Sequence, residues 1–201
     1  MKQIVMPLLL ALGIASAAQA ETLPESLLHC DGRFFNELYA RQSQLRQVAP
    51  MVTDNQHHAW FVPPKNNPGT VWFTQSVAVG ALSVIGYTVQ TNDLDEMGKY
   101  YFWGFVFSNT PESVMAALPA GNWQHTGDIF VSNPLIKNPG NEDWQRNNTA
   151  VSGIAPAKGS AEKLAMLSAE GGKTSLLCSL QGGVTQATLA SLRPDLKGVE
   201  K

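Results

Sequence analysis

The chain has 201 residues, with 14 lysines and arginines against 16 aspartates and glutamates, which gives a formal net charge of −2. Only 15% of the residues are charged, and no basic stripe is visible, so we expect no nucleic-acid partner. The length suits one domain with a substantial hydrophobic core.

The first 20 residues have the pattern of a secretory signal peptide. Lys2 gives a positive start, residues 4–14 are almost wholly apolar, and Ala18-Gln19-Ala20 matches an A-x-A cleavage site. The apolar run is shorter than the roughly 20 residues that a membrane-spanning helix needs. A retained anchor helix is the alternative. We expect cleavage after Ala20, a mature domain over residues 21–201, and a periplasmic location in a bacterium.

The mature chain has two cysteines, Cys30 and Cys178, near its two ends. In an oxidising compartment, two cysteines in a secreted domain most simply form one disulfide. The alternative, a reactive thiol, needs a nearby histidine and a lowered pKa. The pattern therefore favours a bridge that ties the start of the domain to its end.

The first predicted element of the mature chain is helical and covers residues 22–48. Thr22 and Glu25 form a capping-box pattern, and apolar residues follow at helical spacing. Gly32 weakens the middle, so two helices, or a strand and a helix, remain open. Pro50 ends the segment. Residues 51–69 contain several turn signals and are expected to form a loop.

Strands are predicted next. Residues 70–75 form one strand, and residues 77–107 form a long antiparallel hairpin with a polar turn at 91–98. Gly80 and Gly86 are expected to mark bulges or close packing. The segment KYYFWGFVF at 99–107 is apolar on both faces, which is typical of a central strand.

The second half continues with a short helix that begins after Thr110 and ends near Gly121. A strand near residues 127–132 and a long polar loop over 132–160 follow. A loop of that length is uncommon unless it serves a purpose. A hairpin over 163–180 with a two-glycine turn precedes a helix over 184–192.

Together these elements predict a single α+β domain. Its antiparallel sheet has about five or six strands, with an N-terminal helix, a short middle helix and a C-terminal helix.

Two strings resemble catalytic motifs. Ser160-Ala161-Glu162-Lys163 matches S-x-x-K of penicillin-binding proteins, but the S-D-N and K-T-G elements of that class are missing. We interpret it as a turn that leads into a strand. The segment GGKTS at 171–175 resembles the end of a phosphate-binding loop but lacks the earlier glycine, so we interpret it as a hairpin turn. We assign no catalytic residue and no cofactor.

The metal-ligating residue types are few. Asp54, His57 and His58 are close in sequence, but adjacent histidines on a strand point to opposite sides, and zinc usually takes three or four ligands. We interpret them as solvated loop residues and predict no metal site. Separately, Asn147-Asn148-Thr149 forms an N-x-T sequon, which has meaning only in a host that glycosylates.

Five residues are candidates for contacting a partner. Asp93, Asp95 and Glu96 lie at the expected hairpin tip, either as a solvated turn or as a contact for a basic partner. Tyr101 and Trp103 lie on one face of the aromatic strand. That face is either core or, if nothing covers it, an exposed binding patch.

The resulting functional hypothesis is an exported, non-enzymatic protein that binds another envelope or secreted protein, as an inhibitor or immunity-type factor. The candidate surfaces are the tip at 91–98, the loops at 53–69 and 132–150, and an uncovered aromatic face. The alternatives are a periplasmic hydrolase with a site assembled from distant residues, and a small-ligand carrier.

Overall fold

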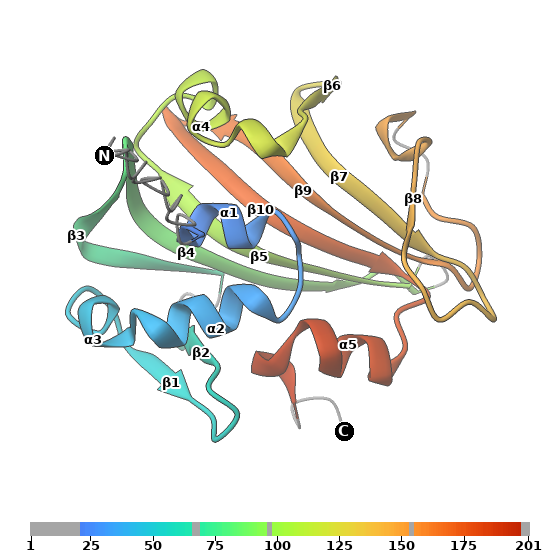
Figure 1. The fold of residues 1–201 in the computed structure, drawn as a ribbon, viewed down its shortest axis with the longest axis horizontal. Coiled ribbons are helices and arrows are strands. Elements are labelled where there is room, and N and C mark those ends of the chain that lie inside the picture. The colour runs from blue at the N-terminus through green and yellow to red at the C-terminus, as the bar shows by residue number, and fades with distance from the viewer. Residues whose placement is uncertain (1–20, 66–68, 96–97, 153–154, 198–201) are drawn as a thin grey trace, which may run out of the picture.

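The computed structural model describes residues 21–65, 69–95, 98–152 and 155–197, so the expected signal peptide lies outside the described residues. A large antiparallel sheet dominates it (Figure 1). Its strands are β3 (Thr70–Val79), β4 (Leu82–Asp93), β5 (Lys99–Phe107), β6 (Gln124–Thr126), β7 (Ile129–Lys137), β8 (Gln145–Arg146), β9 (Ala161–Glu170) and β10 (Lys173–Gly182). Their spatial order is β3-β4-β5-β10-β9-β7-β6, and β8 pairs with β7.

The helices are short. The α-helices are α1 (Leu23–Leu27), α2 (Arg33–Ala40), α3 (Gln42–Leu45), α4 (Pro111–Ala117) and α5 (Gln186–Leu192). The 3₁₀ turns are η2 (Pro119–Gly121), η3 (Ala150–Ser152) and η4 (Pro194–Leu196). Helices α1, α2, α3 and α5 lie on one side of the large sheet (Figure 1). None of the helices within the described ranges has both the length and the hydropathy to cross a membrane.

The core lies between these helices and the side of the sheet that faces them, which we call the inner face. Phe105 of β5, Tyr87 of β4 and Leu176 of β10 are paired across neighbouring strands, so they share this face. The ring of Phe34 on α2 meets Phe105 edge to face at 5.3 Å between ring centroids. All four side chains are almost fully buried. Burial of this apolar surface holds the helices on the sheet.

The α+β class and the mainly antiparallel sheet are confirmed, and β5 is a central strand as predicted. The expected count of five or six strands was too low, because the large sheet has eight strands and a separate two-stranded sheet is present. That small sheet, β1 (Met51–Thr53) with β2 (Ala59–Phe61), lies where a loop was expected. The Asp54 carboxylate organises its turn by accepting hydrogen bonds from two backbone N–H groups, those of Gln56 and His58, both at 2.9 Å.

The N-terminal helix is divided into shorter pieces. The capping box of Thr22 and Glu25 is confirmed at the start of α1. Between α1 and α2, Cys30 has the left-handed backbone value φ = 48°, which ends one helix and turns the chain before the next. A continuous helix could not bring Cys30 to the sheet in this way.

The other expected elements lie close to their predicted positions. The hairpin expected at 77–107 corresponds to β4 and β5, and β3 precedes it as a third antiparallel strand. Gly80 (φ = 59°) makes the turn between β3 and β4 and does not mark a bulge. Thr110 caps α4, Thr185 caps α5, and two glycines form the β9–β10 turn. The expected loop over 132–160 is partly strand, since β7 extends to Lys137 and β8 pairs with it.

Candidate binding surface and pocket

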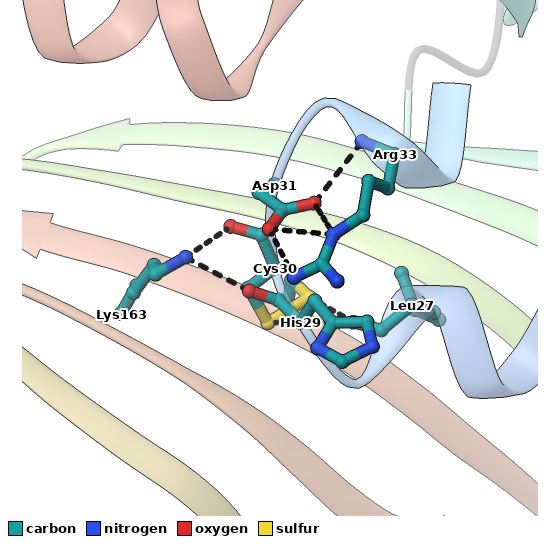
Figure 2. Close-up of a disulfide and its surroundings, with 7 residues drawn as sticks. Leu27, His29, Cys30, Asp31, Arg33 and Lys163 are labelled. Carbon is teal, nitrogen blue, oxygen red and sulfur yellow. Dashed lines mark hydrogen bonds and ion pairs between the residues drawn. A yellow bond between two sulfur atoms is a disulfide. The ribbon is translucent and has the colours of Figure 1, made fainter. Parts of the chain in front are cut away.

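The predicted disulfide joins Cys30, in the α1–α2 turn, to Cys178 in the middle of β10. Both residues are buried, with 2% and 0% of their surface exposed. Figure 2 shows Lys163 reaching from β9 to this turn, where its Nζ donates hydrogen bonds to the carbonyl oxygens of His29 (2.9 Å) and Cys30 (3.4 Å). The bridge and this lysine therefore fix the turn on the inner face, which is a structural role.

Charges next to the bridge are arranged as a small network (Figure 2). Burial acts to raise the pKa of Asp31, but hydrogen bonds from the Arg33 side chain and backbone, together with the charge of Lys163, hold that pKa below its ordinary value. Burial lowers the pKa of Lys163. These charged groups stabilise the turn between α1 and α2.

The predicted hairpin tip is exposed, as expected of a solvated turn. Asp93 and Asp95 are both exposed, and the Asp93 carboxylate accepts a hydrogen bond from the Asp95 backbone N–H at 3.1 Å. Asp95 has the left-handed value φ = 51°. This arrangement gives Asp93 a role in the turn itself. Glu96 lies outside the described residues.

Tyr101 and Trp103 are core residues. They are 1% and 0% exposed, on the inner face of β5. The guanidinium of Arg193 lies over the Trp103 ring, with its Cζ 4.6 Å from the ring centroid, and forms a two-point ion pair with Asp195. Of the two readings of this face, core or exposed binding patch, the burial supports core, so these two candidates for partner contact are not at the surface.

The S-x-x-K string does not assemble a catalytic pair. Ser160 donates its hydroxyl hydrogen to Asn138 just before β9 begins, and Lys163 extends to the opposite, inner side. The interpretation as a turn leading into a strand is confirmed. In the β1–β2 turn, Asp54 pairs with His58 (Nδ1 to Oδ2, 2.8 Å), while the His57 ring lies against a tyrosine instead.

The outer face of the sheet, opposite the helices, carries partly exposed apolar side chains. Trp72 of β3 is 50% exposed, and Phe102 of β5 and Leu177 of β10 are half-buried. We call these three residues the outer patch. The Trp72 indole lies across Gly86, where an added Cβ would come within 3.0 Å of the ring, so the glycine lets the ring lie flat. These three residues lie on β3, β5 and β10, between the β3 edge of the sheet and its centre.

The long loop between β7 and β9 is tied to this outer face by Glu162. Amide groups of Asn147 and Gln181 each donate a hydrogen bond to one oxygen of the Glu162 carboxylate. The Asn147 carbonyl oxygen in turn accepts hydrogen bonds from the backbone N–H (3.1 Å) and hydroxyl (2.7 Å) of Thr149. The sequon asparagine is therefore a buried tether, and the long loop has a structural purpose.

A pocket of about 340 Å³ opens beside this tether. Its floor is the outer face of β5, β7, β9 and β10, and η3 forms one wall. The lining includes the side chains of Tyr100, Ile129, Val131, Glu162, Leu164 and Met166. Burial raises the pKa of Glu162, although the hydrogen bonds from Gln181 and Asn147 oppose this shift.

Sequence reasoning missed Glu162 as a site residue. A usable signal was present, because Glu162, Leu164 and Met166 alternate along one strand and must share a face. A glutamate that shares a strand face with two apolar side chains is expected to be at least partly buried.

No protein-family model, curated protein or solved structure matches the chain.

Proposed function

We propose that the protein is an exported, non-enzymatic binding protein of the bacterial envelope, which engages another protein as an inhibitor or immunity-type factor. The observation that carries this proposal is the outer patch. Tryptophan is enriched at the energetic centres of protein interfaces, and Trp72 is half-exposed on this face of the sheet. The pattern at residues 1–20 and the disulfide are compatible with export.

The shape of the patch also supports a protein partner. Leu177 lies opposite Gly104 of β5, so that strand offers no side chain beside it, while β9 places Met166 on its other side. Trp72 is placed on the edge strand β3, with the Lys173 ammonium 5.8 Å from its ring centroid. Partly exposed apolar side chains of this kind suit a partner that inserts an apolar anchor.

Site-specific photo-cross-linking in the bacterium of origin tests this proposal. A photoreactive phenylalanine analogue replaces Trp72 or Phe102 in the full-length chain, and Val52, which is 44% exposed on the β1–β2 hairpin, is the matched control position. We expect one protein adduct of constant mass from positions 72 and 102 and none from position 52.

A second variant makes the result specific to the patch. Leu177→Lys, combined with the photoreactive group at 102, should abolish that adduct, because an unpaired charge would be buried in the interface. Equal labelling at 52 and 72, or an adduct that survives Leu177→Lys, would overturn the proposal.

A further inference from the structure

The pocket is lined in part by the buried carboxyl group of Glu162. Glu162 is 1% exposed, and within the described ranges its carboxyl oxygens accept hydrogen bonds from two neutral amides and form no ion pair. Its neighbour Lys163 faces the other side of the sheet and donates to backbone carbonyls there. A buried carboxylate without a nearby cation is energetically costly, and a bound cation would offset that cost.

The surroundings of the carboxylate are apolar. Val131, Leu164 and Ala150 form a small hydrophobic cluster of their own, against which Ile129 and Met166 pack. All five residues also line the pocket. Tyr100, from the adjacent part of β5, adds an aromatic side chain. Such a site, with mainly apolar walls and one charged group, is the usual composition of a pocket for a small organic molecule.

We propose that this pocket binds a small organic cation, whose ammonium group pairs with Glu162 and whose apolar body lies against Leu164, Met166 and Val131. The carboxylate oxygens each accept one hydrogen bond from an amide, and each retains acceptor capacity for a further donor. The volume, about 340 Å³, is at the small end of the range for ligand pockets. The pocket adjoins the outer patch, since Met166 is paired with Leu177 across the strands and the ring of Tyr100 stacks on Phe102, but none of the residues that would hold the cation belongs to the patch.

Three probes with the same six-carbon chain test the chemistry: hexylammonium, hexan-1-ol and hexanoate. Each is titrated into the oxidised mature protein, and methyl resonances of Leu164, Val131 and Met166 are followed by NMR, with those of Val52 as a distant reference. We expect saturable shifts at the pocket methyls with hexylammonium, and at least tenfold weaker binding of the other two probes.

Variants assign the recognition to Glu162. Glu162→Gln should weaken hexylammonium binding at least tenfold, whereas Glu170→Gln, at the exposed end of the same strand, should leave it unchanged. Because Glu162→Gln could loosen the loop held by Asn147, Met166→Phe provides a second variant that narrows the pocket and leaves the carboxylate in place. It should weaken hexylammonium binding without changing the loop resonances.

Several outcomes would overturn the inference. Equal affinity for hexylammonium and hexan-1-ol would show that the pocket does not recognise charge. Tighter binding of hexanoate would assign the site to acids. An absence of shifts at the pocket methyls, or hexylammonium binding that Met166→Phe leaves unchanged, would show that this pocket is not the site. The cross-linking test of the outer patch is a separate experiment with none of these probes, so its outcome is read on its own.

Discussion

Replacing Asp195 by asparagine tests the buried ion pair beneath α5. Arg193 is 0% exposed, and its Nε and Nη2 donate hydrogen bonds to Asp195 at 2.8 and 2.7 Å. The third nitrogen, Nη1, has no hydrogen-bond partner among the described residues. Asp195 is thus the only ion-pair partner that the structure gives this guanidinium in the described part of the chain. Asp195→Asn leaves a full positive charge enclosed against the ring of Trp103.

The expected cost is large. Removing one partner of a buried pair typically destabilises a protein by about 3–5 kcal/mol, because the remaining charge stays buried without compensation. A typical domain has a net stability of only about 5–15 kcal/mol, so Asp195→Asn should remove a large part of it. In a chain of this size, each kcal/mol corresponds to roughly 2–4 °C in Tm.

Removing both charges should cost less than removing one. In Arg193→Met/Asp195→Asn, the methionine can pack on Trp103 and no buried charge remains. We therefore expect the double variant to be more stable than Asp195→Asn alone.

Urea unfolding, followed by tryptophan fluorescence at neutral pH, measures these differences as changes in midpoint at constant m. Asp128→Asn is the matched control, because Asp128 is exposed in the β6–β7 turn and should change stability by no more than about 0.5 kcal/mol. A loss below about 1 kcal/mol for Asp195→Asn would refute the reasoning, since it would mean that water or another group compensates Arg193.

Three further predictions concern the rest of the fold. In Cys30→Ala/Cys178→Ala, the free energy of unfolding in urea should fall by about 5 kcal/mol, because the bridge closes a loop with a sequence separation of 148 residues. A fall of less than about 1 kcal/mol would contradict this loop-entropy reasoning. The pKa of Asp31 is lowered in the fold, so its contribution is present at neutral pH and is lost as the pH falls below about 4. The stability gap between wild type and Asp31→Asn should therefore narrow on acidification, and a gap that stays constant would disagree. Gly104→Ala places a Cβ in steric conflict with the backbone oxygen of Leu176 in β10, so it should lower Tm by several degrees, whereas Gly69→Ala, which meets nothing within 4 Å, should not.

Local features of the fold could be predicted because local physics decides them. Thr22 with Glu25, Thr110 and Thr185 cap helices where their side-chain oxygens meet free N–H groups of the first turn. The two glycines after β9 supply the positive φ values of a tight hairpin turn. The pairing of Cys30 with Cys178 was predictable for another reason, since the chain has no other cysteine.

The expectations that were wrong depend on contacts that spacing does not show. The turn signals at 51–69 predicted a loop, but Asp54 folds part of that segment into a hairpin that packs against α2 through β2. Gly80 was expected to mark a bulge or close packing, but it makes the β3–β4 turn, and only the pairing of β3 with β4 shows this.

The sequence by itself determined that β5 is apolar on both faces and that β9 begins with two opposite charges. It did not determine which face of the sheet the helices would cover. The covered face decides which side chains of β5 and β9 become core and which stay near the surface. Trp103 became core and Phe102 remained half-exposed, although both are aromatic neighbours on one strand. Glu162 and Lys163 likewise point to opposite sides, one to the pocket and one to the disulfide turn. Alternation is a local property of a strand, but burial depends on segments far away in the chain, so only the tertiary structure could decide it.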